Sequence, residues 1–345
     1  MSAPYDRALR DAIADVAASV PGADLSRAVE TLSRRYRDGA TLAGGGATAA
    51  VGRLTEAERL AYVVVRLPAT AAALDAAFDA VARHTRVAPR TLTDLGAGPG
   101  TVLWPAVSRW PGIRRVTLVD RDPELLQLGV RLWRHDVAGA GAGPTVDVRT
   151  GDLAAADAPA ADVVVLSYAI GELAEARAAQ AIERALALAT GALVVIEPGT
   201  PPGFARIRAA RDRLIAAGAT IAAPCPHQAA CPMAGGDWCH FAVRLERSRA
   251  HRQSKHAALG WEDEKFAYVV AVRDASVLRA RAGGRILRRP HKGTGHVRLA
   301  LCAPGGVTDE VVTRRAPTYR QARDAAWGDA WPPVDNRMAE LDLDA

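Results

Sequence analysis

The stretch Asp94-Leu95-Gly96-Ala97-Gly98-Pro99-Gly100 decides which fold this sequence can adopt. It follows a short apolar segment, Thr91–Leu95, and precedes a segment with helical character, Thr101–Trp110. Glycine at three alternate positions lets the backbone turn tightly and approach a ligand with no Cβ in the way. A turn of this composition between a strand and a helix predicts the first unit of a cofactor-binding α/β sheet.

Segments with strand and helix character alternate along the chain around this turn. The run Val163-Val164-Val165-Leu166 is continuously apolar, as expected for a strand that is buried on both faces. Helices are predicted between the strands, for example at Pro123–Trp133 and Ala174–Ala189. This alternation predicts a doubly wound parallel sheet of the α/β class. The predicted strands are Thr91–Leu95, Ile113–Val119, Thr145–Arg149, Asp162–Leu166 and Ala192–Ile196.

The details of the turn favour S-adenosylmethionine over a dinucleotide. Pro99 removes an amide that a pyrophosphate cradle would use, and the spacing is Gly-x-Gly-x-Gly rather than Gly-x-Gly-x-x-Gly. Asp120 ends the second predicted strand and is placed to accept hydrogen bonds from ribose hydroxyls, while Asp152 follows the third strand and could contact the adenine amino group. We therefore expect a class I S-adenosylmethionine methyltransferase sheet, which is Rossmann-like. The candidate cofactor contacts are Asp94, Gly96, Ala97, Gly98, Gly100, Asp120 and Asp152.

Candidate catalytic residues follow the fourth predicted strand. Enzymes that methylate amino groups often carry an Asn/Asp-Pro-Pro-Tyr/Phe turn there, whereas this chain has Leu166-Ser167-Tyr168-Ala169-Ile170-Gly171-Glu172-Leu173. Tyr168 could stack on a base and Glu172 could act as a general base. The alternative is that Tyr168 packs in the core and Glu172 begins a helix. No cysteine lies where a C5-methylating nucleophile would be needed.

Four cysteines, Cys225, Cys231, Cys239 and Cys302, are the only ones in the chain. Three fall within fifteen residues, and such a cluster in a cytosolic protein indicates a metal site before it indicates disulfides. Zinc sites usually contain tight Cys-x2-Cys pairs, so their absence favours an iron–sulfur cluster, which also takes four thiolates. Zinc with His227 or His240 replacing one cysteine is the first alternative. Four small buried apolar side chains are the second.

The charge of the chain is concentrated near its C-terminal end. The net charge is +6, but the stretch from Phe241 to Ala330 has 18 Lys and Arg against 9 Asp and Glu, which leaves −3 for the remainder. This surplus predicts a polyanionic partner, with RNA expected rather than DNA. Few aromatic residues lie nearby, so contact with the backbone of folded RNA is favoured over base stacking. The alternative is Arg–Glu pairing on a solvated surface. The candidate RNA-binding residues are Arg285, Arg288, Arg289 and Lys292.

These patterns divide the chain into four parts. Residues 1–88 are expected to form an N-terminal helical region, and residues 89–221 the cofactor-binding core. Residues 222–330 would hold the cysteine site, the last sheet strands and a basic extension that the metal braces, and residues 331–345 a loose tail. Met1–Arg10 has no apolar segment after a basic start, and no apolar run approaches the ~20 residues that span a bilayer. We therefore expect a cytoplasmic protein with no membrane partner.

Several of these motifs together resemble one family. The cysteine block, the segments Arg66–Thr70 and Glu262–Phe266, Arg288-Arg289-Pro290 and Trp327-Gly328-Asp329 are similar to the small-ribosomal-subunit methyltransferase-like proteins of bacteria and mitochondria, over about residues 55–330. The resemblance implies a class I methyltransferase fold with added helical and β segments. It also implies a 4Fe–4S cluster on the four cysteines.

The same resemblance implies a partner and a role. The partner would be the small ribosomal subunit or its 16S rRNA, and the role would be in assembly or translation. We expect an S-adenosylmethionine-dependent rRNA methyltransferase. The alternative is a non-catalytic assembly factor that uses the fold and the cluster as an RNA clamp. A small-molecule methyltransferase is less favoured because it leaves the basic C-terminal third unexplained.

Overall fold

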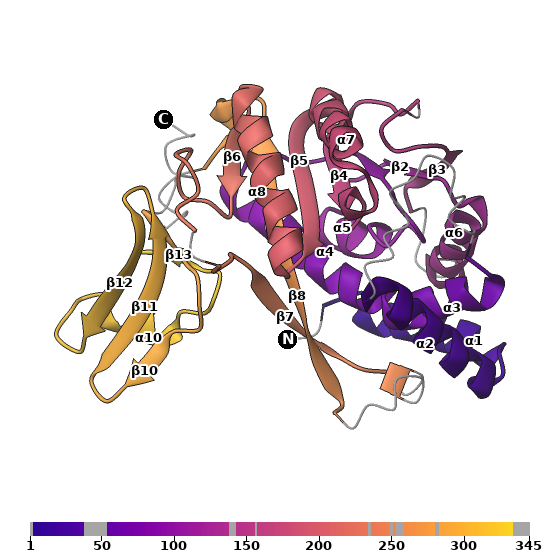
Figure 1. The fold of residues 1–345 in the computed structure, drawn as a ribbon, viewed down its shortest axis with the longest axis horizontal. Coiled ribbons are helices and arrows are strands. Elements are labelled where there is room, and N and C mark those ends of the chain that lie inside the picture. Colours follow the sequence, from indigo (N-terminus) through magenta and orange to yellow (C-terminus); the bar gives the residue numbers. More distant parts are fainter. Residues whose placement is uncertain are drawn as a thin grey trace.

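The computed structural model describes residues 3–37, 54–137, 143–155, 157–233, 236–248, 251–252, 259–279 and 283–333. Most of the expected tail, residues 334–345, lies outside them. An eight-stranded sheet forms the body of the molecule, and a smaller five-stranded sheet lies beside it (Figure 1).

The large sheet has the strand order β3-β2-β1-β4-β5-β8-β6, with β7 paired to β8. Strands β1 to β5 are parallel to one another, whereas β8 runs antiparallel to both β5 and β6. A parallel sheet with a reversed strand inserted at this point is the topology of class I methyltransferases. The strands are β1 (Thr91–Leu95), β2 (Arg115–Asp120), β3 (Thr145–Thr150), β4 (Ala161–Ser167), β5 (Ala189–Pro198), β6 (Thr220–Ala223), β7 (Phe241–Glu246) and β8 (Trp261–Val272).

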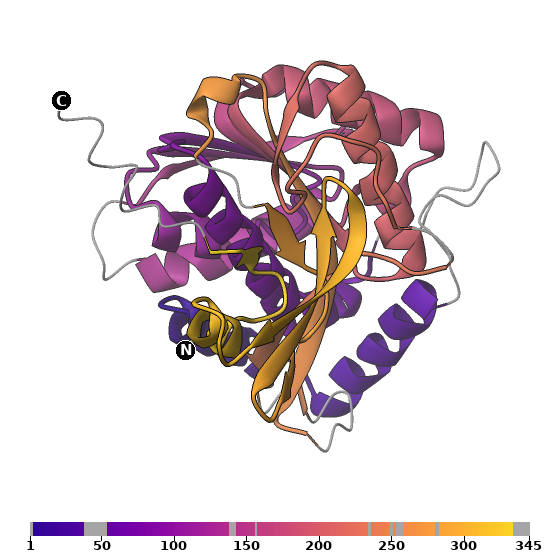
Figure 2. The same cartoon turned by 90° about the vertical axis from the view of Figure 1, so that its left-hand side faces the viewer.

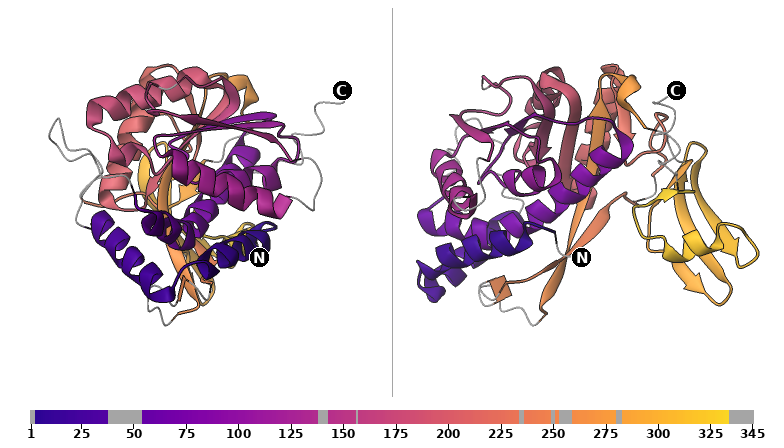
Figure 3. Two further views of the ribbon diagram at one scale, coloured as in Figure 1. Left: turned by 90° about the vertical axis from the view of Figure 1, so that its right-hand side faces the viewer. Right: turned by 180° about the vertical axis from the view of Figure 1, so that it is seen from behind.

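Helices cover both faces of this sheet, which is why its central strands are apolar throughout (Figure 3). Along β5, Val194 and Ile196 face the core beneath α4, α5 and α6, and Leu193 and Val195 face the core beneath α7 and α8. The helices are α4 (Leu67–His84), α5 (Leu103–Arg109), α6 (Pro123–Val137), α7 (Glu175–Leu188) and α8 (Pro201–Ala216), with a short 3-10 turn, η1 (Ile170–Glu172), before α7.

Three further helices precede α4: α1 (Asp6–Ala18), α2 (Gly22–Arg37) and α3 (Glu56–Val65). Helix α3 begins at a capping box, in which the Thr55 hydroxyl accepts a hydrogen bond from the Glu58 amide and the Glu58 carboxylate accepts one from the Thr55 amide. Within the described chain no single helix has the length and apolar character to cross a bilayer, although α3 and α4, bent by 46°, pass that test as a pair on length and composition.

The smaller sheet has the order β10-β11-β9-β13, with β12 paired to β11. It has its own core, in which Ile286, Leu299 and Trp331 are buried, and α10 (Tyr319–Asp324) packs against it. Figure 2 shows this sheet standing in front of the large one. Its strands are β9 (Gly284–Ile286), β10 (His291–Gly293), β11 (His296–Ala303), β12 (Gly306–Thr313) and β13 (Ala330–Trp331), and the 3-10 turn η2 (Ala275–Val277) precedes it.

The packing of α6 on the glycine-rich turn gives a direct test of this fold. Gly129 of α6 lies so close to the turn that an added Cβ would overlap the carbonyl of Pro99. Glycine to alanine in a helix usually stabilises by roughly 0.5–1 kcal/mol. Here we expect Gly129→Ala to destabilise by about 1–3 kcal/mol, because the added methyl group overpacks the contact. Urea unfolding measures the change.

Gly112→Ala is the matched control, since no atom lies within 4 Å of the position of its added Cβ. A Gly129→Ala protein as stable as the Gly112→Ala protein would contradict the close approach of α6 to the turn.

Candidate functional site

The turn after β1 has no spare amide for a phosphate. The amides of Gly96 and Ala97 both donate to the carbonyl of Val119, at 2.8 and 2.9 Å, and the amide of Gly100 donates to the carbonyl of Ala97 at 2.9 Å. The Gly98 amide donates to Oδ2 of Asp120 at 2.8 Å. Pro99 has no amide proton. A pyrophosphate would therefore find its usual donors already engaged, which disfavours a dinucleotide.

Three glycines of the turn adopt positive φ angles of 81°, 53° and 65° at Gly96, Gly98 and Gly100. An added Cβ would lie 2.6 Å from Cβ of Ala169 at Gly96 and 2.7 Å from Cδ1 of Leu118 at Gly100. At Gly98 the only neighbour within 4 Å is Cδ2 of Leu125, at 3.8 Å. Gly96 and Gly100 therefore serve close packing, while Gly98 leaves space beside the turn.

Two carboxylates lie at this edge of the sheet. Asp94 on β1 is buried, and its Oδ1 has no hydrogen-bond partner within the described chain. Burial, reinforced by the charge of Asp120, raises the pKa of Asp94 to about 8. Burial also raises the pKa of Asp120, although amides of Asp122 and Gly98 oppose the shift. An unpartnered buried carboxyl fits the cationic amino group of S-adenosylmethionine, because a cation there would compensate its desolvation.

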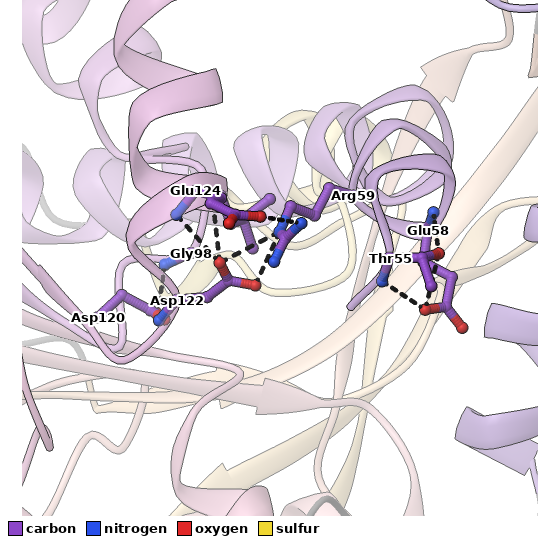
Figure 4. A network of polar contacts seen from close by, with 8 residues as sticks. Thr55, Glu58, Arg59, Gly98, Asp120, Asp122 and Glu124 are labelled. Atoms are coloured by element: carbon purple, nitrogen blue, oxygen red, sulfur yellow. Dashed lines mark hydrogen bonds and ion pairs between the residues drawn. The ribbon is translucent and has the colours of Figure 1, made fainter. Parts of the chain in front are cut away.

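The loop that carries Asp120 is held by the N-terminal helices (Figure 4). Arg59 of α3 is buried and donates from Nε to both carboxylate oxygens of Asp122, at 3.0 and 3.1 Å. Its Nη1 forms an ion pair with Glu124 at 2.5 Å. Asp122 in turn donates its amide to Oδ1 of Asp120 at 2.9 Å. Helix α3 therefore fixes the orientation of the predicted ribose-binding carboxylate.

Asp152, the candidate adenine contact, lies just after β3 and is more exposed than Asp120. Its Oδ2 pairs with Nη2 of Arg177 at 2.6 Å, and its Oδ1 accepts a hydrogen bond from the amide of Ala154 at 2.8 Å. Its position at the carboxyl end of a parallel strand is the one expected for the site. Both of its oxygens already have partners, so a contact with adenine stays a prediction.

The candidate catalytic residues lie within a polar network at the end of β4. Tyr168, which has a positive φ of 55°, donates its hydroxyl to Oε1 of Glu264 at 2.9 Å. The guanidinium of Arg66 lies 5.7 Å from the centre of the tyrosine ring and 3.4 Å from Glu264. Burial raises the pKa of Tyr168 well above its usual range. Tyr168 is thus engaged within the protein at both its ring and its hydroxyl.

Glu172 and Glu197 are two carboxylic acids in this region whose pKa values lie close to neutral pH. Burial raises the pKa of each to about 7, even though Arg121 pairs with Glu172 at 2.9 Å and Arg206 with Glu197 at 3.2 Å. Sequence reasoning identified Glu172 but not Glu197. The signal for Glu197 is its position at the end of β5, at the same edge of the sheet as Asp94.

The structure brings the four cysteines to one partly enclosed, apolar space between α8, β8 and the smaller sheet. Cys225, Cys231 and Cys239 come from the segment between β6 and β7, and Cys302 from β11. All four are free thiols. Among the described residues, no three His, Cys, Asp or Glu side chains are grouped closely enough to hold a single metal ion. The four thiols therefore line one space, but they are too far apart to coordinate a single metal ion together.

Electrostatics at the cysteine site follow from burial and from two guanidinium groups. Burial, with the neighbouring thiols, raises the pKa of Cys302 to about 12 and also raises that of Cys239. Arg211 and Arg285 oppose the shift at Cys225. His227 approaches Cys302, with Nε2 at 3.5 Å from Sγ, whereas His240 stacks on Trp238 and packs against Trp327. Burial therefore favours the protonated thiol at Cys225, Cys239 and Cys302.

The prediction that Arg285 binds RNA is wrong, because Arg285 is buried between the two sheets. Its guanidinium donates to the carbonyls of Pro224 at 2.7 Å and Gly328 at 2.9 Å, and it meets Nε2 of His84 at 3.0 Å. A basic segment in a sequence does not distinguish a buried arginine from an exposed one. Arg285 instead supports the loop that leads to Cys225.

The other three predicted RNA contacts lie nearer the surface. Arg288 is partly buried and bonds to the carbonyl of Leu287 and to Asp237. Arg289 is 75% exposed and lies 3.9 Å from Asp263. Lys292 on β10 is exposed. Arg289 and Lys292 are therefore the two of the four that a large ligand could reach freely.

The fold and the turn define a protein of the class I methyltransferase type. The family described as mitochondrial small ribosomal subunit Rsm22 matches residues 56–332. The chain belongs to this family.

Curated relatives include the human mitochondrial ribosome assembly protein METTL17, which is 31% identical over 298 residues, covering 81% of this chain and 63% of the human protein. Two mitochondrial Rsm22-cox11 tandem proteins of Schizosaccharomyces pombe are 25% identical, covering 70% of this chain and 38% of theirs. The chain thus spans less than two thirds of the length of these relatives.

Similar solved structures include human N-acetylserotonin methyltransferase in complex with S-adenosylmethionine, at 16% identity and a TM-score of 0.39 over 72% of this chain and 67% of that one. Magnesium protoporphyrin IX methyltransferase from Synechocystis PCC 6803 aligns at 14% identity and a TM-score of 0.40, over 73% of this chain and 100% of that one.

The expectation of a cytoplasmic protein is contradicted by these comparisons. The family description and the names of the human and S. pombe relatives all specify mitochondria. The expectation rested on Met1–Arg10, where no apolar segment follows a basic start, and this segment overlaps helix α1.

The raised pKa of Asp94 predicts how cofactor binding depends on pH. Because burial favours the protonated carboxyl, Asp94 in the ligand-free folded protein keeps its proton at pH values where the unfolded chain has lost it. The free energy of unfolding therefore falls as the pH rises from about 4 to about 8. A cationic ligand favours the carboxylate form of Asp94, so its binding is coupled to loss of the proton. The affinity for S-adenosylmethionine should therefore rise by up to about tenfold per pH unit between pH 6 and 7.5.

Calorimetry at several pH values measures this dependence, and Asp94→Asn is the matched variant because it keeps the shape and removes the titration. The variant should bind more weakly, with a flatter pH profile. An equally steep profile in both proteins would assign the pH dependence to other groups, such as Glu172 or Glu197.

Proposed function

We propose that this protein binds S-adenosylmethionine and acts on the small ribosomal subunit during its assembly, through contact with the rRNA. The observation that carries the cofactor assignment is the buried, unpartnered Oδ1 of Asp94 beside a turn whose amides are all engaged. Membership of the family and the name of the human relative, a ribosome assembly protein, support the partner. Exposed basic side chains on the smaller sheet support contact with RNA.

We further propose that Cys225, Cys231, Cys239 and Cys302 hold a 4Fe–4S cluster. The donor set fits, since four thiols from two parts of the chain line one apolar space. The guanidinium groups of Arg211 and Arg285 lie beside it, and Nε of Arg211 is buried with no hydrogen-bond partner in the described part of the chain. These cations suit an anionic cluster. When bound, the cluster would supply a structural link between the large sheet and β11.

Methyl transfer to rRNA is the enzymatic form of this proposal. Glu172 is suited to accept a proton from a target group, because its pKa of about 7 lies near physiological pH. The nearby charge of Asp120 contributes to this raised pKa. Tyr168 is less suited to hold a base, since its hydroxyl donates to Glu264. The alternative is a non-catalytic assembly factor that retains the cofactor site, and the engaged Tyr168 favours it.

The ribosomal role predicts which RNA the protein contacts in cells. Crosslinking followed by sequencing of bound RNA should recover small-subunit rRNA from cells that express the protein. Small-subunit particles from a strain that lacks the protein, supplied with labelled S-adenosylmethionine, test methyl transfer. Asp120→Ala should abolish cofactor binding, because it removes the ribose acceptor and the partner of the Gly98 amide.

Asp157→Ala is the control for Asp120→Ala, because the Asp157 side chain is fully exposed and far from β2 in sequence. If the protein binds S-adenosylmethionine but no labelled methyl group appears in the rRNA, the result would support the role of a non-catalytic assembly factor. No enrichment of ribosomal RNA would refute the proposed partner.

The metal proposal predicts the composition of the purified protein. Protein purified without oxygen should contain about four irons and four sulfides per chain, the content of a cubane held by four thiolates. Serine at any one of the four cysteine positions should lower the iron content and loosen the segment between β6 and β7. His227→Gln should keep the iron. One zinc per chain, lost in the His227→Gln protein, would replace the cluster with a zinc site.

A further inference from the structure

Three basic side chains from separate elements converge on one open groove of the smaller sheet. Lys292 lies on β10, Arg314 directly after β12, and Arg323 on α10. The groove has a volume of about 620 Å³ and is polar. The rest of its wall is formed by Gly293, Thr294, Gly295 and Tyr319.

The cations in this groove differ from the neighbouring arginines in having no acidic partner. Arg288 pairs with Asp237, and Arg289 lies near Asp263. Lys292, Arg314 and Arg323 have no ion pair within the described chain, and no carboxylate lines the groove. Like charges that converge without a counter-charge create a strong positive potential, which attracts an anion.

The floor of the groove is a tight turn that holds the cations in place. Gly295 has a φ of 78°, and its carbonyl accepts a hydrogen bond from the amide of Arg314 at 2.8 Å. An added Cβ on Gly293 would lie 2.5 Å from the ring of His296. Tyr319 packs against the core of the smaller sheet, which fixes its ring in the wall. The turn and the wall are therefore formed before any ligand arrives.

We propose that this groove binds the phosphodiester backbone of small-subunit rRNA, an inference that rests on the proposed function. An open groove admits a polymer, whereas a small anion is usually enclosed. Three cations spread over three elements match successive phosphates, and the fixed ring of Tyr319 offers a surface for a ribose or base. The RNA contact predicted from the sequence is thus assigned to this groove, which contains Lys292, and no longer includes the buried Arg285.

The experiment measures binding of a fluorescein-labelled small-subunit rRNA transcript to the full chain, across about 50 to 200 mM KCl. The triple variant Lys292→Gln, Arg314→Gln, Arg323→Gln should weaken binding by about tenfold or more and flatten the salt dependence by about two counterions. Each single variant should flatten it by about 0.7 to 0.9. Arg320→Gln is the matched control, because it removes an exposed arginine from α10 that does not line the groove.

The outcomes separate this inference from the proposed function. Failure of the unmodified protein to bind the transcript would refute the rRNA partner itself. Binding by the unmodified protein together with an unchanged salt dependence in the triple variant would overturn the groove alone. An equal loss in the Arg320→Gln protein would also overturn it, because general charge would then explain binding. Circular dichroism checks the fold of the triple variant, and the single variants decide the question if it fails to fold.

Discussion

The guanidinium of Arg285 is the contact on which the arrangement of the two sheets depends. It lies on β9 of the smaller sheet and bonds to the carbonyl of Pro224 after β6, to the carbonyl of Gly328 before β13, and to His84 at the end of α4. A buried cation is costly unless its donors are satisfied, and here two carbonyls and an imidazole nitrogen from three parts of the chain lie within hydrogen-bond distance. The same contacts place the backbone that leads into Cys225 beside the strand that carries Cys302.

At the carboxyl edge of the large sheet, the dominant feature is buried carboxyl groups. The amides of the turn after β1 donate to Val119 and Asp120 on β2 and, within the turn, to Ala97, so the polar groups left for a ligand are carboxylates. Burial and the charge of Asp120 disfavour ionisation of Asp94, and Arg59 of α3 holds the loop between β2 and α6. A cationic ligand relieves this situation, whereas a phosphate worsens it. The N-terminal helices therefore support the proposed cofactor site as well as the core.

Much of this could be predicted from the sequence where burial leaves a continuous apolar pattern. The five parallel strands were placed to within a few residues, since strands such as β4 are apolar on both faces. Strand β12 was missed because its residues are mostly exposed and polar, and its pairing with β11 holds it in place. Arg59 could not be found from spacing, because it reaches Asp122 from a helix more than sixty residues earlier. The burial of Arg285 was hidden for a related reason, since its partners lie far along the chain.

Strand β11 joins the cysteine site to the basic groove. Cys302 lies near one end of the strand, and the turn at Gly293–Gly295 precedes the other end. At about 3.4 Å per residue, these ends are roughly 20 Å apart. A rotation of the strand by about 5° at the cysteine end would move the far end by almost 2 Å over that length. A change in how the thiols are held would therefore reach the groove through the backbone of this one strand.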